Sequence, residues 1–407
     1  MSPLVVIAWV LGIVAGLNAL FWVLFAVRIG RMMASGFSLR RGLRLPVDPK
    51  SVSIVIPAHN EDRIIRRCLE SMLAQKWDDL EIIVVADRCT DDTEAIILEL
   101  AANDKRLKLI RNEDCPENWA GKCHAVRVGA EQARGELLAF IDADTQASPD
   151  LIRAAVAELQ RRDLAMLSLL TNLTCEHWFE RTTQPVASMA LMGLFPPDRV
   201  NREGSGRAFA NGQFMMFDRQ WYEQIDGHNA VKDDLLEDIA FARRLVHRED
   251  GRVNILRSDG LLGCSMYGDF EAFRRGWMRI FLEATNRTIK LLRKQAARQL
   301  VVGWALPAIS LAAIIVGLMV VVGDASSQSD VSAAGLVSLW GGVAGLATQF
   351  GAIAWCYAIA KQPLWTVVLF PVGAWHVFGL MRWAIRALRQ GEAVKWGGRE
   401  YVLKARG

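Results

Sequence analysis

The sequence predicts an α/β domain with a mostly parallel, Rossmann-like sheet, flanked by N-terminal and C-terminal transmembrane helices. Three observations carry this prediction. The 407 residues are 52% hydrophobic, which is high for a soluble enzyme. Long apolar stretches lie near the two ends of the chain, and the middle alternates short β-branched runs with helical periodicity. Seven scattered cysteines in so long a chain exclude a small disulfide scaffold.

The first apolar stretch, residues 4–27, carries no charged side chain and is long enough to cross a bilayer. A signal peptide would place cations before this stretch, whereas the first cation here is Arg28. We therefore expect a retained N-terminal anchor over residues 1–28. Because basic residues follow the anchor, the positive-inside rule places the next domain in the cytoplasm, on a multi-pass protein of the plasma membrane.

Three further apolar stretches, at 300–322, 331–360 and 363–383, predict a C-terminal transmembrane region over 299–383. Four complete spans would put the tail, residues 384–407, on the outside, yet this tail is basic. Since Pro371 and Gly373 interrupt the last stretch, we expect that stretch to be re-entrant or interfacial and the tail to be cytoplasmic. The net charge of +4 is too small to indicate a nucleic-acid partner.

The soluble domain is predicted over residues 45–298. Strands are expected at 52–56, 81–86, 107–111 and 137–141, and helices at 61–75, 92–102, 121–134 and 149–161. The aromatic and basic stretch 270–294 predicts a helix on an anionic membrane surface. The apolar segment 177–195 is either a second interfacial element or a helix packed on the sheet. Ligands of such sheets bind beyond the carboxyl ends of the strands, so the residues found there are the candidate site.

Polar side chains follow the second and the fourth of these strands. Asp87 directly follows the second strand, too early to cap the next helix, so we predict that it contacts the base or ribose of a nucleotide. The fourth strand leads into Asp142 and Asp144, whose carboxylates share one side of an extended chain. Such a pair suits Mg²⁺ or Mn²⁺, completed by diphosphate oxygens. A solvated strand end is the alternative explanation for this short pattern.

Two helix starts add candidate residues. Lys122 follows a glycine at the start of a helix, an arrangement that suits a diphosphate, although a plain surface loop is the alternative. Glu237 and Asp238 belong to an acidic run at another helix start, where the helix dipole alone favours acids. The dipole does not require the adjacent pair, and a carboxylate beside an acceptor hydroxyl can act as general base.

In this order the motifs resemble the membrane-integral family 2 glycosyltransferases with a GT-A fold. The resemblance covers roughly residues 50–280 and runs through 56–61, Asp87, 121–122, 142–144, 211–213, 227–228 and 237–238. It is closest to bacterial transferases that act on carotenoid or hopanoid-type lipids, and more distant for ceramide glucosyltransferases. The resemblance implies an inverting, metal-dependent enzyme that moves a sugar from a nucleotide-sugar, in particular a UDP-sugar, to a membrane lipid.

The resemblance also implies residue roles. Nucleotide-sugar contacts are implied for Pro57, Glu61, Asp87, Lys122 and Asp142, the metal for Asp144, and catalysis for Glu237 and Asp238, with Asp238 as the base. Related enzymes carry a Gln/Arg-x-x-Arg-Trp motif, but residues 273–277 read Phe-Arg-Arg-Gly-Trp. We expect Trp277 to border the acceptor, with Arg274 or Arg275 stabilising the departing diphosphate. A processive polysaccharide synthase and a non-catalytic, membrane-anchored nucleotide-sugar-binding protein remain the alternatives.

Overall fold

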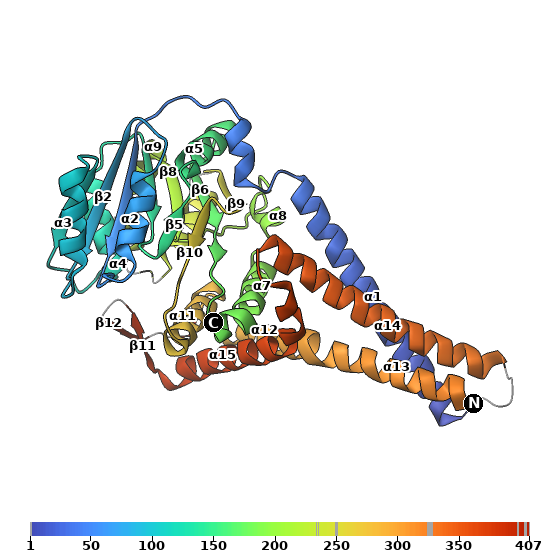
Figure 1. Ribbon diagram of the computed structural model, residues 1–407. Coiled ribbons are helices and arrows are strands. Elements are labelled where there is room, and N and C mark those ends of the chain that lie inside the picture. Colours follow the sequence, from blue (N-terminus) through green and yellow to red (C-terminus); the bar gives the residue numbers. More distant parts are fainter. Residues whose placement is uncertain are drawn as a thin grey trace.

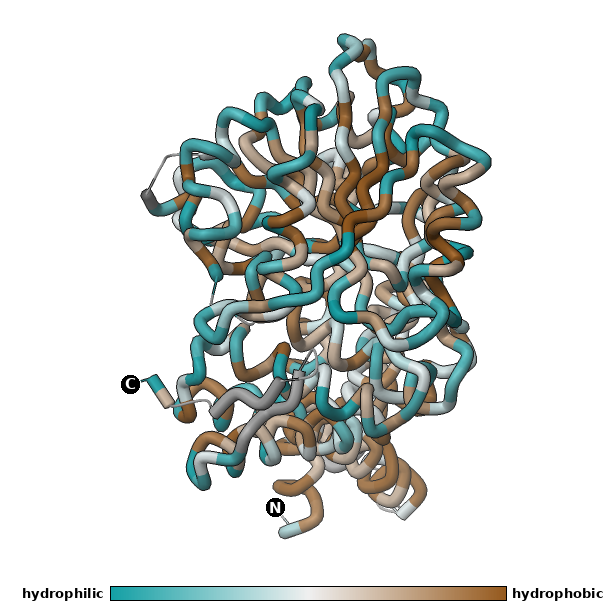
Figure 2. The backbone as a smooth tube through the Cα atoms, turned by 90° about the vertical axis from the view of Figure 1, so that its left-hand side faces the viewer, coloured by the Kyte–Doolittle hydropathy of each residue, from teal (hydrophilic) through white to brown (hydrophobic). Residues whose placement is uncertain are grey.

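The computed structural model describes residues 2–406 apart from positions 233, 235, 249–250, 324–328, 397–398 and 403–404. It consists of an α/β part and a bundle of long helices that points away from it (Figure 1). The central strands and the long helices are among the most apolar segments of the backbone (Figure 2). The predicted fold class is therefore confirmed: an α/β domain flanked by apolar helices near both ends of the chain.

A seven-stranded sheet forms the centre of the α/β part, in the order β3-β2-β1-β4-β8-β6-β9. Its strands are β1 (Val52–Ala58), β2 (Leu80–Asp87), β3 (Leu107–Asn112), β4 (Leu137–Ile141), β6 (Met166–Leu170), β8 (Phe214–Asp218) and β9 (Val253–Arg257). Strands β1 to β4 are mutually parallel, whereas β8 runs antiparallel to β4 and β6. The start of β8 therefore lies at the same sheet edge as the ends of β1, β2 and β4.

Helices cover the sheet at the predicted places: α2 (Ile65–Leu73), α3 (Thr93–Asn103), α4 (Gly121–Gln132) and α5 (Leu151–Arg162). Helix α2 begins four residues later than expected, because Asn60 adopts a left-handed backbone with φ 57° and the chain turns there. A small sheet of β5 (Thr145–Ala147), β10 (Leu262–Cys264) and β7 (Asn172–Leu173) lies beside the end of β4.

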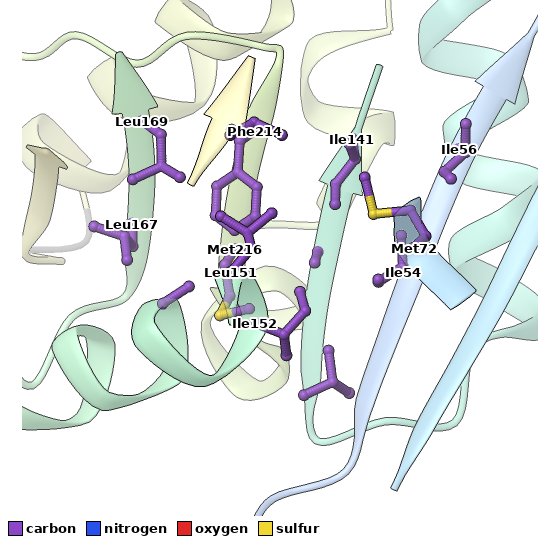
Figure 3. Close-up of a cluster of buried hydrophobic side chains, with 14 of the residues drawn as sticks. Ile54, Ile56, Met72, Ile141, Leu151, Ile152, Leu167, Leu169, Phe214 and Met216 are labelled. Atoms are coloured by element: carbon purple, nitrogen blue, oxygen red, sulfur yellow. The ribbon is translucent and has the colours of Figure 1, made fainter. Parts of the chain in front are cut away.

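Apolar side chains between the sheet and helices α2 and α5 fix the position of that edge. Ile54, Ile141 and Phe214 point from three neighbouring strands toward Met72 and Ile152 on the helices (Figure 3). All five are at most 1% exposed, and burial of one such side chain contributes about 1.5–3 kcal/mol. The strands whose ends carry the candidate site are thus held in a close-packed core.

Four helical segments among the described residues are long and apolar enough to cross a membrane. Helices α1 (Pro3–Ala34), α13 (Leu306–Gly323) and α14 (Ser329–Ile359) form the bundle (Figure 1). The fourth segment, Leu364–Gln390, comprises a 3₁₀ turn and α15 (Phe370–Gln390). Helix α15 leaves the bundle and packs against α7 (Gln184–Leu194), α11 (Phe270–Ala284) and α12 (Ile289–Leu300). The last apolar stretch therefore packs beside the bundle that the other three form.

Small residues let the bundle helices approach closely, which gives a matched test. A Cβ atom at Gly12 would lie 2.9 Å from backbone atoms of Ser338 in α14, whereas nothing lies within 4 Å of one at Gly16. Gly12→Leu should destabilise the bundle by about 1–3 kcal/mol through overpacking, and Gly16→Leu should not. Thermal unfolding in one detergent measures both. Equal midpoints for the two variants would contradict this packing.

Candidate active site

The carboxylates after β4 lie where the end of β4 meets the start of β8. The Asp142 amide donates to the carbonyl of Gln213, just before β8, at 3.4 Å, and the Ser265 amide donates to the Asp144 carbonyl at 3.0 Å. Oδ1 of Asp144 is buried and has no hydrogen-bond partner among the described residues. Burial and the negative charge of Asp142 raise the pKa of Asp144 to about 7. A cation beside Asp142 and Asp144 would offset the repulsion between the two carboxylates and stabilise the ionised form of Asp144.

Lys122 joins this carboxylate pair to the second acidic pair. Its Nζ lies 2.7 Å from Oδ1 of Asp142 and 2.9 Å from Oε1 of Glu237, at the start of α10 (Glu237–Arg248). Burial alone would lower the pKa of Lys122, but the charges of Asp142 and Glu237 raise it above its usual range. Lys122 is therefore a fixed positive charge between the two predicted carboxylate motifs, which the structure brings into one site.

Asp238 is held in place by backbone amides. Gly212 donates its N–H to Oδ2 at 2.8 Å, and Ile239 donates its N–H to Oδ1 at 2.7 Å. Burial and the charge of Glu237 raise the pKa of Asp238 to about 7. For Glu237 the ion pair with Lys122 outweighs burial and lowers the pKa. Asp238 is thus the member of this pair that can exchange a proton near neutral pH.

The residues expected to contact the nucleotide lie along the same sheet edge. Glu61, after β1, is close enough to Asp144 and Asp142 that burial and their charges raise its pKa to about 8. Asp87, at the end of β2, accepts hydrogen bonds from Asn112 Nδ2 at 2.7 Å and from the Arg88 guanidinium at 2.7 and 3.0 Å. Glu61 therefore belongs to the carboxylate cluster, and Asp87 lies in a separate polar group at the ends of β2 and β3.

Pro57 lies within β1, opposite Val85 of β2, one residue before the strand ends. The next polar side chain, His59, places its Nδ1 2.6 Å from the carbonyl of Asp87. Pro57 therefore lies directly before the loop after β1, in which His59 contacts Asp87 and Glu61 belongs to the carboxylate cluster.

The structure does not bring Arg274 and Arg275 to this cluster. Both form ion pairs with Glu271 on the exposed start of α11, and the guanidinium of Arg274 lies over the Trp383 ring at 4.7 Å. Arg279, on the same helix, is only 8% exposed. Burial lowers the pKa of Arg279, and Tyr267 and the charges of Glu237, Asp238 and Asp142 oppose this shift. Arg279 is the arginine of α11 that belongs to the site.

Sequence reasoning missed Arg279, although a signal was present. Gly276 occupies the arginine position of the related motif, and a side chain there would collide with the Tyr267 ring. Arg279 follows three residues later, so it lies on the same face of the helix. An arginine at i+3 from the vacant motif position was the available clue.

Trp277 is 2% exposed and lines a cavity of about 750 Å³ between the α/β part and the membrane helices. Asn211 and Gln213, which flank the amide that holds Asp238, line the same cavity. Phe21, Trp22, Leu24 and Phe25 of α1 contribute an apolar wall. One continuous cavity thus reaches from the first membrane helix to the neighbourhood of Asp238.

The stretch 270–294 forms two helices and not the one helix expected from the sequence. The segment forms α11 and the start of α12, separated where Asn286 and Arg287 take left-handed backbone conformations. The apolar side chains Phe273, Trp277 and Phe281 are at most 2% exposed, because α11 packs on α15 and α7. The segment 177–195 forms α6 (Trp178–Thr182) and α7, and α7 lines the cavity.

Comparison with known proteins gives a family match for part of the chain. Residues 53–226 match the family described as "Glycosyl transferase family 2". The match covers less than half of the chain and contains most of the mixed, mostly parallel sheet.

Individual relatives are similar over parts of their length. A beta-monoglucosyldiacylglycerol synthase of Nostoc sp. is 28% identical over 201 residues, which cover 48% of this chain and 41% of the relative. The 4,4'-diaponeurosporenoate glycosyltransferase of Staphylococcus aureus is 23% identical over 265 residues, covering 63% and 69%. The chain thus spans less than half of the first relative. A solved Pyrobaculum calidifontis mannosyltransferase, in complex with GDP-Man and Mn²⁺, has 18% identity and a TM-score of 0.47, covering 94% and 98% of the chains.

Proposed function

We propose that this protein is an inverting, metal-dependent glycosyltransferase that moves a sugar from a nucleotide-sugar, specifically a UDP-sugar, to a membrane lipid. The observation that carries the proposal is the position of Asp238. It lies in the cluster of carboxylates around Lys122, and the loop that holds it lines an apolar cavity walled by α1. The polar sheet edge suits a charged donor, and the cavity suits a lipid chain.

The donor would bind at the ends of β1, β2 and β4. Asp144 would hold Mg²⁺ or Mn²⁺, and its buried Oδ1, which has no hydrogen-bond partner among the described residues, supports this assignment. Among the described residues no three His, Cys, Asp or Glu side chains gather as a complete metal cage, so donor diphosphate oxygens would complete the shell. The bound ion would neutralise part of the diphosphate charge. Asp87 would contact the nucleoside.

The protein's own residues account for the transfer step. Asp238 takes the proton of the acceptor hydroxyl, whose oxygen then bonds to the anomeric carbon of the sugar. The bond between that carbon and the diphosphate breaks, and its electron pair leaves with the diphosphate. Attack from the face opposite the leaving group inverts the anomeric centre. Lys122 and Arg279 supply fixed positive charge for the departing group.

The membrane arrangement supports a site on the cytoplasmic face of the plasma membrane. With three spans, α1, α13 and α14, the α/β part and the C-terminal tail lie on one side. A contact of the tail supports this placement on the same side. The Thr288 hydroxyl, just before α12, donates to the carbonyl oxygen of Arg406 at 3.3 Å. Basic residues that follow α1 assign this side to the cytoplasm. Helix α15 would then lie along the α/β part without crossing.

A transfer assay tests the proposal. Membranes that contain the protein are incubated with radiolabelled UDP- and GDP-sugars, Mg²⁺ or Mn²⁺, and the products are partitioned between chloroform and water. We expect label from a UDP-sugar in the chloroform phase and its loss with a chelator. Label only in a water-soluble polymer would favour a processive synthase. Donor binding without any transfer would favour a binding protein.

The pH profile is a second expected outcome. Asp238 accepts a proton only when ionised, and its raised pKa of about 7 means that the ionised fraction falls below that pH. We therefore expect kcat/KM to rise about tenfold per pH unit up to pH about 7 and then to level off. The pKa of Lys122 is raised, so Lys122 stays charged across this range. A profile that is flat between about pH 5 and 8 would contradict the assignment of the base.

A further inference from the structure

More positively charged than negatively charged side chains line the cavity. Five arginines and two aspartates contribute to its wall: Arg28, Arg199, Arg207, Arg257, Arg298, Asp198 and Asp259. Both aspartates are already paired, Asp198 with Arg28 at 2.6 Å and Asp259 with Arg257 at 2.6 Å. The other three arginines have no acidic partner among the described residues. The cavity is therefore lined by three exposed arginines without an acidic partner among the described residues, beside an apolar wall.

The three remaining arginines gather around the end of α7. The Arg298 guanidinium, from α12, lies against Gly193 of α7. Arg199 belongs to α8 (Pro197–Val200), directly after α7. Arg207 precedes Phe209, whose ring stacks on Phe195 with centroids 4.7 Å apart. Arginine at a membrane-helix end is ordinary, but Arg199 and Arg207 come from the α/β part and still face the cavity.

We propose that the acceptor is an acidic lipid, a long apolar molecule that carries its own carboxylate or phosphate. Arg199, Arg207 and Arg298 bind the anionic group, because guanidinium forks match the oxygens of these groups. The chain lies between α1 and α7, against side chains such as Phe25 and Met189. This inference rests on the proposed transfer to a lipid and narrows its acceptor to a chemical class.

Photolabelling without a donor tests the inference independently of turnover. The full-length protein in phosphatidylcholine nanodiscs is irradiated with a diazirine-bearing fatty acid or with the fatty alcohol of the same chain. We expect the acid to label peptides of α1 and α7 about tenfold more than the alcohol, since a charge-assisted contact contributes roughly one order of magnitude. Equal labelling by the two probes would overturn the proposal.

Variants assign the preference to residues. The double variant Arg207→Gln, Arg298→Gln should reduce labelling by the acid to the level of the alcohol and leave labelling by the alcohol unchanged. Arg207→Lys with Arg298→Lys should keep the preference. Arg275→Gln is the matched control, because Arg275 pairs with Glu271 outside the cavity. Unchanged acid labelling in the double glutamine variant would also overturn the proposal.

Competition separates an acidic acceptor from ordinary acidic bilayer lipids. If excess phosphatidylglycerol abolishes labelling by the fatty acid, the arginines bind bulk headgroups and the proposal fails. If the preference persists, the acid-binding site is specific. If labelling by the acid stays stronger than labelling by the alcohol but no sugar is transferred to any lipid, the acid-binding site stands and only the proposed function is overturned.

Discussion

Asp238→Asn is expected to lower sugar transfer by about 10²- to 10⁴-fold and to leave the affinity for the nucleotide-sugar within about twofold. The amide cannot take the acceptor proton, which removes the base. Donor affinity should be retained because the charge proposed to face the diphosphate comes from Lys122, which forms ion pairs with Asp142 and Glu237. Turnover is measured with labelled donor, and binding by calorimetry with UDP.

The same variant has a structural cost that must be measured separately. Both oxygens of Asp238 accept backbone N–H groups, and asparagine offers only one oxygen. One amide would lose its partner, at about 1–3 kcal/mol. Asp226→Asn is the matched control, since Asp226 is exposed and asparagine tolerates its left-handed backbone, φ 64°. Normal turnover in folded Asp238→Asn protein would eliminate this base.

Arg279→Gln is expected to lower kcat by about 10²- to 10³-fold, because it removes a buried positive charge near the carboxylate cluster where we propose that the diphosphate departs. The affinity for UDP should fall about tenfold or more, whereas the affinity for uridine, which lacks the phosphates, should not change. The comparison of UDP with uridine separates a role at the diphosphate from general damage to the site.

Two further variants sharpen this result. Arg279→Lys keeps the charge and should recover part of both losses. Arg275→Gln changes an arginine of the same helix that pairs with Glu271 at the exposed end, so it should have no effect on either ligand. An equal loss of UDP and uridine affinity in Arg279→Gln would indicate that Arg279 only supports the fold.

The sheet edge was predictable because its determinants are local. Short apolar strands followed by Asp87 or by Asp142 and Asp144 are visible in the sequence, and parallel strands bring such ends together. The antiparallel direction of β8 was not predictable, since no local pattern encodes the direction of pairing. The hydrogen bond from the Gly212 amide to Asp238, which depends on this strand direction, could therefore not be predicted from the sequence.

The remaining features depend on contacts between distant segments. Arg279 is buried on α11, which packs against α15 from the far end of the chain, and Tyr267 fills the space beside Gly276 on the same helix. The sequence of the aromatic stretch 270–294 cannot show that α15 packs against it or that the helix is interrupted at Asn286 and Arg287. The cavity likewise forms between α1, α7 and α14, and its lining exists only in the assembled fold.

The most direct measurement of the central claim is mass spectrometry of membrane lipids from cells that express the protein or its Asp238→Asn variant. We expect a lipid heavier by one sugar residue in cells with the unchanged protein, and its unmodified parent in cells with the variant. Identical lipid profiles in the two cell lines, with both proteins present in equal amounts, would contradict the claim that Asp238 and the cavity together form a lipid glycosylation site.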